Sequence, residues 1–195
     1  MGQYYVLANM DKREVLTIDG KLLGGKLLEI SQTETEYRAI LNQIAGTWKS
    51  DAVFLVGDYA DLSEENVTYF RALRIWTDKL HIVKNLYGYV MENFRKVDGC
   101  MDNLGYRFIY NHARKEYIDM LHCLNVCDET DWEQGYIAPL PLLIAMGNGR
   151  GGGDYYNYEN DNLVGTWCDS IASVEITMKP KDELGYEEVH PDFRY

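Results

Sequence analysis

Cysteine, proline, basic residues and long apolar runs are all scarce in this sequence. Its 195 residues include 4 Cys and 4 Pro. There are 19 basic residues and 31 acidic ones, which gives a net charge of -12. Four cysteines are too few for a disulfide scaffold, so we expect reduced thiols. The acidic balance argues against a protein that wraps DNA or RNA by neutralising phosphates. No apolar run approaches the roughly 20 residues that a membrane span requires.

The length and the ordinary apolar content fit a single compact domain over residues 1–195. The first six residues contain neither the basic segment nor the apolar segment of a secretory signal peptide. We therefore expect a cytoplasmic protein with no membrane partner. Residues 179–195 are polar and acidic, and we expect this tail to be partly loose.

Two stretches of the chain resemble each other. Residues 4–16 and 106–118 share Tyr, Asn, two basic residues and Glu at the same offsets. Gly46-Thr-Trp48 and Gly165-Thr-Trp167 follow in the same order, each before an Asp and an apolar run. Matched segments in matched order indicate two related halves, with the two tryptophans as core anchors.

Each half, about 1–100 and 101–195, opens with a pattern typical of a β-hairpin. An apolar run is followed by an Asn with polar neighbours and then by a second β-favouring run. Two further runs predict single strands. The expected hairpins and strands are 4–8 with 14–18, 106–110 with 116–120, 53–56 and 174–178.

Helical signals lie between these strands. Ser31 and Glu34 have the spacing of a capping box, which predicts a helix that Gly46 ends. A second helix is expected from Ser63, while 81–94 and 140–146 each fit a helix or a strand. The predicted fold class is therefore α+β, with two related halves, antiparallel hairpins and packed helices that share one sheet or pack closely. The residues expected on the buried side of the first helix are Tyr37, Ile40, Leu41 and Ile44.

The most unusual segment runs from Gly147 to Asp154 and has five glycines in its first seven residues. Glycine loses the most conformational freedom on folding, so such a segment suits a close approach of backbone to a ligand. Successive free N–H groups and the Arg150 charge favour an anion, and the tyrosines that follow suit a planar group. We expect a small phosphate-bearing or nucleotide-like ligand. The candidate ligand-binding residues are Gly149, Arg150, Gly151, Gly152, Gly153, Asp154, Tyr155 and Tyr156.

This segment has two other interpretations. Gly147, Gly149 and Gly152 match the dinucleotide-binding fingerprint, but the residues after them are a poor helix start, so a Rossmann site is not expected. A loose connection between elements is the plainer alternative.

Asp58 and Asp61 follow the expected strand 53–56 and are the candidate metal residues. Two carboxylates there suit Mg²⁺ or acid–base chemistry, although a turn at Asp58 and a helix start after Asp61 are the plainer interpretation. His122, Cys123 and Cys127 have part of a zinc spacing, but no second cysteine pair follows. The sequence therefore predicts no dedicated metal site and does not identify a cofactor. None of the four histidines has a catalytic or metal-binding partner that the sequence pattern reveals.

Several of these segments together resemble a family of bacterial and phage proteins. They are the Met1-Gly-Gln-Tyr-Tyr5 opening, Gly57-Asp-Tyr-Ala-Asp61, Asn111-His112 and the segment from Gly147 to Tyr155. They cover roughly 40% of the chain and lie in both halves. The resemblance implies a prokaryotic or phage cytoplasm and carries no activity over.

The sequence is compatible with three functions. The first is a small-molecule binding module, for example a phage or defence-related protein that sequesters a signalling nucleotide. The second is a metal-dependent hydrolase or phosphodiesterase that uses Asp58 and Asp61. The third is an acidic module that masks a basic partner surface. We favour the binding module because no set of nucleophile, base and oxyanion donors is visible, and a homo-oligomer is among the open alternatives.

Overall fold

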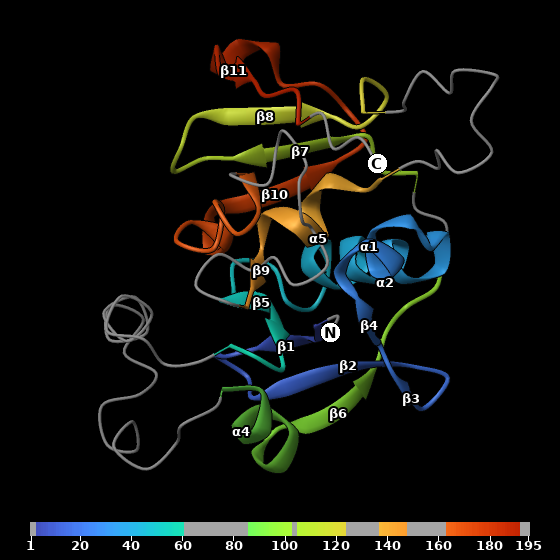
Figure 1. Ribbon diagram of the computed structural model, residues 1–195. Helices are drawn as coiled ribbons and strands as arrows, with labels where there is room; N and C mark the ends of the chain where they lie inside the picture. Colours follow the sequence, from blue (N-terminus) through green and yellow to red (C-terminus); the bar gives the residue numbers. More distant parts are fainter. Residues whose placement is uncertain (1–2, 61–85, 103–104, 124–136, 148–162, 192–195) are drawn as a thin grey trace, which may run out of the picture.

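The computed structural model describes residues 3–60, 86–102, 105–123, 137–147 and 163–191 (Figure 1). The helix expected from Ser63, the candidate metal residue Asp61 and Cys127 lie outside the described residues. The same holds for the whole candidate ligand-binding set from Gly149 to Tyr156.

The first sheet is built around the amino-terminal hairpin. Strand β1 pairs antiparallel with β2 and β5, and the strand order is β3-β2-β1-β5-β9. Strand β4 also pairs with β1, and β6 pairs in parallel with β2. The bounds are β1 Tyr4–Asn9, β2 Glu14–Ile18, β3 Lys21–Leu22, β4 Gly24–Lys26, β5 Val53–Gly57, β6 Arg95–Asp98 and β9 Ala145–Met146.

The second sheet is built around the second hairpin and has the order β10-β7-β8-β11. Its inner face carries Ile109, Ile118 and Val174, which are all buried, whereas the neighbouring positions Tyr110, Tyr117 and Glu175 on the other face are aromatic or charged. The bounds are β7 Phe108–Asn111, β8 Glu116–Asp119, β10 Val174–Thr177 and β11 Glu187–Glu188.

Helices α1, α2 and α5 lie between the two sheets (Figure 1). Their apolar faces and the inner faces of both sheets form one continuous core, in which Ile40, Leu41 and Ile44 are buried as expected and Tyr37 is half-buried. The helix bounds are α1 Leu27–Gln32, α2 Glu34–Ala45, α4 Leu86–Asn93 and α5 Pro139–Leu143, with 3-10 turns η2 Ile171–Ser173 and η3 Asp182–Leu184.

The expected capping box at Ser31 is wrong. Ser31 lies inside α1, and its hydroxyl donates to the carbonyl oxygen of Leu27 at 2.8 Å. The helix starts earlier, where the Glu29 carboxylate accepts the backbone N–H of Lys26 at 3.0 Å, and Thr33 then separates α1 from α2. The predicted end of α2 at Gly46 is confirmed.

The mixed α+β class is confirmed, and the structure assigns the described parts of both ambiguous segments, since 81–85 lie outside the described residues. Residues 86–93 form α4, while 140–146 contain the end of α5 and the short strand β9. Each hairpin has its own sheet, but the first sheet also contains β9 from the second half, which pairs in parallel with β5. The last predicted strand ends at Thr177, and Met178 is exposed rather than buried.

The two hairpins make corresponding contacts. The Asn9 side-chain oxygen accepts the backbone N–H of Lys12, as Asn111 accepts that of Arg114. Each of these cations then donates to the backbone carbonyl oxygen of Thr47 or Thr166, next to the tryptophan. The descent of both halves from one duplicated unit stays a prediction, but their local geometry is alike.

The part of the tail that the structure describes, 179–191, contacts the second sheet, and the expectation that the tail is partly loose stays a prediction. Its strand β11 pairs in parallel with β8, and the backbone N–H of Lys181 donates to the Tyr110 hydroxyl at 2.7 Å. Among the described helices, none has the length and apolarity needed to cross a membrane.

Candidate metal centre

The outer face of the second sheet carries one cross-strand row of four side chains. Glu175 on β10 is opposite Tyr110 on β7, Tyr110 is opposite Tyr117 on β8, and Tyr117 is opposite Glu188 on β11. The two tyrosine rings stack with centroids 5.4 Å apart. The row therefore has an aromatic middle and a carboxylate at each end.

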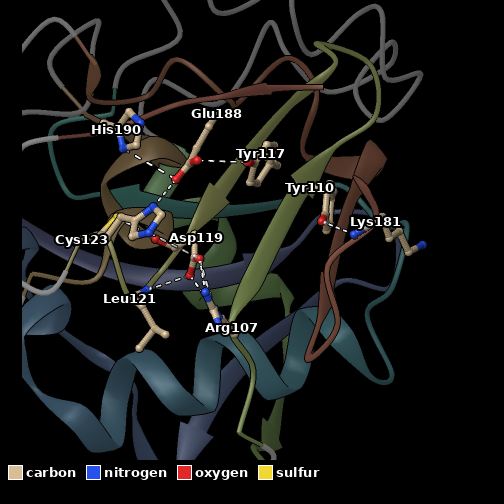
Figure 2. A network of polar contacts seen from close by, with 10 residues as sticks. Arg107, Tyr110, Tyr117, Asp119, Leu121, Cys123, Lys181, Glu188 and His190 are labelled. Carbon is tan, nitrogen blue, oxygen red and sulfur yellow. Dashed lines mark hydrogen bonds and ion pairs between the residues drawn. The ribbon is translucent and has the colours of Figure 1, made fainter. Parts of the chain in front are cut away.

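The Glu188 end of the row gathers two histidines (Figure 2). His122 hydrogen-bonds to Glu188 Oε1 through Nδ1, and His190 Nδ1 lies 3.7 Å from the same oxygen. The two imidazole centroids are 5.9 Å apart. One ligand atom from each of His122, Glu188 and His190 lies within 4.8 Å of the other two. We call these three residues the His–Glu–His cluster.

Strand geometry and a tight turn explain why these residues meet. Glu188 and His190 are two positions apart in an extended segment, so their side chains leave the same side of the chain. His122 comes from the turn after β8, where its backbone N–H donates to the carbonyl oxygen of Asp119 at 2.9 Å. The parallel pairing of β11 with β8 brings the two segments together.

Asp119, the last residue of β8, lies next to His122 of the cluster. Its side chain is only 4% exposed, and Arg107 holds both carboxylate oxygens through bonds of 2.6 to 3.1 Å. The backbone N–H of Leu121 donates to the same carboxylate at 3.1 Å, and His122 Nε2 lies 3.9 Å from it. His122 is thus oriented between Glu188 on one ring nitrogen and Asp119 on the other.

The hydrogen bonds set the charge states of the cluster. The bond to Glu188 raises the pKa of His122. Desolvation acts to raise the pKa of Glu188, but hydrogen bonds from His122 and Tyr117 outweigh it and leave that pKa below its usual range. The Arg107 bonds likewise hold the pKa of Asp119 low. Glu188 and Asp119 are therefore carboxylates near neutral pH and act as acceptors.

Asp58 lies directly after β5, away from the His–Glu–His cluster in the sequence and on the other sheet. Its carboxylate accepts the backbone N–H of Tyr4 at 3.2 Å, and its own N–H donates to the Tyr4 carbonyl oxygen at 2.8 Å. Its expected partner Asp61 lies outside the described residues. The described contacts of Asp58 tie the chain after β5 to the start of β1.

Gly147 opens the glycine-rich segment and lies beside Gln3. Strands β5 and β9 run in parallel, with Val56 opposite Met146, so Gly57 and Gly147 occupy the same sheet end. A Cβ on Gly57 would lie 2.7 Å from Gln3 Cδ, and one on Gly147 would lie 2.8 Å from it. Three motifs that are distant in the sequence therefore converge at this end of the sheet.

The Gln3 amide at this position is fully buried and only half satisfied. Its Oε1 accepts the Tyr5 hydroxyl at 3.0 Å, while its Nε2 has no hydrogen-bond partner in the described part of the chain. An unsatisfied buried donor costs about 1–3 kcal/mol, so this position needs an explanation such as a bound acceptor.

Sequence reasoning did not identify the His–Glu–His cluster. It grouped His122 with Cys123, but the Cys123 thiol is buried and donates to the Asp119 carbonyl oxygen at 3.7 Å. Cys127 lies outside the described residues. The one local signal was Glu188-Val-His190, a carboxylate and an imidazole at alternate positions of a β-favouring segment.

No protein-family model, no curated protein and no solved structure matches this chain. The resemblance to bacterial and phage proteins therefore stays a prediction.

Proposed function

We propose that this protein binds a divalent transition-metal ion, with zinc as the type case, through His122, Glu188 and His190. The supporting observation is the convergence of two imidazoles and one carboxylate, with ligand atoms within 4.8 Å of one another. In a tetrahedral zinc site, bonds of about 2.0–2.2 Å place the ligand atoms about 3.3 Å apart. The 3.7 Å between His190 Nδ1 and Glu188 Oε1 is already close to that spacing.

The donor set also suits such an ion chemically. Imidazole and carboxylate together are ligands for zinc and for non-haem iron, whereas Mg²⁺ and Ca²⁺ prefer oxygen donors alone. Asp119 lies on the far side of the His122 ring, where a carboxylate fixes the ring orientation of a metal-binding histidine. His122 and His190 are half or more exposed, at 52% and 64%, so an incoming ion reaches the ligands from solvent.

Three protein ligands leave a coordination position open for water or a substrate group. A metal bound in this way polarises a carbonyl or phosphoryl oxygen, or lowers the pKa of its water. The residues of this chain supply the orientation: Tyr117 donates to Glu188 Oε2 at 3.0 Å, and Arg107 fixes Asp119.

The test is a titration of chelator-treated protein with Zn²⁺ by calorimetry and with Co²⁺ by visible absorption. We expect one ion per chain, with affinity reduced at least about tenfold in Glu188→Gln and in His190→Gln. The matched control is His112→Gln, because His112 also binds a glutamate on the same sheet face but, among the described residues, belongs to no cluster with a second imidazole. Equal binding by the wild type, Glu188→Gln and His190→Gln would overturn the proposal.

We propose as a second function the binding of a small phosphate-bearing or nucleotide-like ligand beside Gly147. The observation that favours it is the buried Gln3 Nε2, which has no hydrogen-bond partner among the residues that the structure describes, at the sheet end where Gly147 begins the glycine-rich segment. Arg150 would supply the positive charge for the phosphate.

Native mass spectrometry of gently purified protein tests this second proposal. We expect an added mass of a few hundred daltons that Arg150→Ala loses while its melting temperature stays unchanged. The double variant Asp58→Asn with Asp61→Asn separates this function from a hydrolase, because it should keep the ligand. A bare chain that gains no mass from a phosphate or nucleotide mixture would count against the proposal.

A further inference from the structure

The other end of the cross-strand row carries a second histidine with two partners. His112 Nε2 lies 2.8 Å from Glu175 Oε2, and His112 Nδ1 lies 3.2 Å from the Tyr186 hydroxyl oxygen. His112 follows the Asn of the second hairpin, Glu175 is on β10, and Tyr186 lies between η3 and β11. A carboxylate, an imidazole and a phenol from three separate segments thus form one chain of hydrogen bonds.

The direction of these bonds follows from the donors and acceptors available. A carboxylate only accepts, so the hydrogen between His112 and Glu175 belongs to Nε2. In the neutral imidazole Nδ1 is then the acceptor, and the Tyr186 hydroxyl must be the donor. The imidazole is therefore held in the tautomer that can remove the phenol proton.

Lys181 stabilises the carboxylate end of this chain. Its ammonium group lies 2.6 Å from Glu175 Oε2, the same oxygen that His112 approaches. Its bond, followed by that of His112, lowers the pKa of Glu175. The backbone of Lys181 is fixed in turn by its bond to the Tyr110 hydroxyl. Glu175 is thereby held ionised, which supports a positive charge on His112 after proton transfer.

Ring contacts fix the imidazole and leave it within reach of solvent. The His112 ring is nearly parallel to Tyr110 at 6.4 Å and meets Tyr186 edge-on at 5.8 Å. The side chain of His112 is 37% exposed, and Tyr186 is half-buried. Tyr117 offers a contrast on the same face, because its hydroxyl donates to the Glu188 carboxylate, which raises the pKa of its phenol.

We propose that Tyr186 is a nucleophile that His112 activates as a general base, with Glu175 as the positioning residue, and that the group it accepts is the acyl group of a neutral ester. A nucleophile on a base that a third group orients is the arrangement that covalent catalysis requires. Asp182 and Glu183 add negative charge near Tyr110, and the Lys181 ammonium is engaged by Glu175. That environment repels a phosphate and favours an uncharged electrophile.

In the acylation step the Tyr186 oxygen attacks the ester carbonyl carbon and forms an aryl ester. The carbon–oxygen bond to the leaving alkoxide breaks, and the Tyr186 proton passes through His112 Nδ1 to that alkoxide. In the second step a water molecule attacks the aryl ester and gives its proton to His112. The carboxylic acid leaves, and the phenol of Tyr186 regains its proton.

The test is acylation by p-nitrophenyl acetate at neutral pH, followed by nitrophenolate release and by peptide mass spectrometry. We expect an acetyl group on Tyr186 that forms faster than on Tyr117, and that is absent in Tyr186→Phe. The rate should fall at least about a hundredfold in His112→Gln, which is the lower end of what general base catalysis contributes. Glu175→Gln should slow acylation while its melting curve shows a folded protein.

The matched control is Glu187→Gln, which makes the same change as Glu175→Gln at an exposed position of β11 and should leave acylation of Tyr186 unchanged. Adding a chelator should likewise have no effect, which separates this activity from the proposed metal centre. Acylation of Tyr186 at the same rate in the wild type and in His112→Gln, or no faster than Tyr117, would overturn the inference.

Discussion

Trp48 and Trp167 make the same bond in the two halves of the molecule. The indole N–H of Trp48 donates to Glu14 at 2.6 Å, and that of Trp167 donates to Glu116 at 3.1 Å. Both glutamates are the first residue of the second hairpin strand, and both tryptophans are buried. The hydrogen bond thus connects each hairpin to the segment before another strand of its sheet, which is β5 after Trp48 and β10 after Trp167. We call this bond the tryptophan–glutamate clasp.

Replacing these tryptophans should destabilise the protein unequally. A hydrogen bond to a charged group contributes about 1.5–3 kcal/mol, and Glu14 is the more buried acceptor. We expect Trp48→Phe to lower the free energy of unfolding by about 2 kcal/mol and Trp167→Phe by less, measured by urea denaturation. The control is Tyr4→Phe, an exposed position. A Trp48→Phe curve equal to the control would refute the role of the bond.

Asp119 should tune metal affinity without touching the ion. Asp119→Asn removes the charge that faces His122 Nε2, and such outer partners typically change metal affinity by about 10–100-fold. The Zn²⁺ titration described above measures the effect. Asp98→Asn is a suitable control, since that carboxylate bonds Thr17 and Gly20 in the first sheet. Unchanged affinity in Asp119→Asn would show that His122 is not held from this side.

Gly147 and Gln3 should be energetically coupled. A Cβ on Gly147 meets the Gln3 amide, and overpacking of a buried site costs about 1–3 kcal/mol. In a Gln3→Ala background that obstacle is gone, so Gly147→Ala should cost less there. A double-mutant cycle by urea denaturation measures the difference. Strictly additive effects would mean that the two residues do not meet in solution.

Glu175 predicts a specific acid sensitivity. Its pKa is below the usual range, first because of Lys181 and then because of His112. An unfolded glutamate titrates near about 4.3, so the stabilisation is complete above that pH and is lost as the pH falls through the lower folded value. Glu175→Gln should therefore be less stable than the wild type at pH 7, with the gap closing towards pH 3. Glu187→Gln, at an exposed position of β11, is the control, and a gap independent of pH would refute the linkage.

Local patterns predicted the hairpins and the tryptophan anchors well, because each depends on residues close in the sequence. The Asn of each hairpin bonds a backbone N–H three residues later, and the pattern of polar residues after it marks the turn. The start of α1 could not be predicted in the same way. The Glu29 carboxylate accepts the backbone N–H of Lys26 there, whereas the sequence pattern indicated Ser31, a more common type of capping residue.

The clusters at the two ends of the row could not be predicted, because parallel pairing of β11 with β8 creates one and the fold of the tail creates the other. His122 and Glu188 are 66 positions apart, and His112 and Tyr186 are 74 apart. In the sequence alone, His112 and His122 are isolated histidines, and Glu188 is one of several acidic residues in the tail. Only the Glu-x-His alternation at 188–190 was visible beforehand, without the partner that completes it.

Met10 and His112 occupy the same place, directly after the Asn that turns each hairpin. Met10 is buried, whereas His112 is partly exposed and carries polar partners. Each hairpin has its own tryptophan–glutamate clasp, Trp48 with Glu14 and Trp167 with Glu116. A substitution at the Met10 position therefore leaves the clasp in the second sheet intact, and a substitution at His112 leaves the clasp in the first sheet intact. The second sheet therefore carries a polar, titratable side chain at the place where the first sheet has a buried methionine.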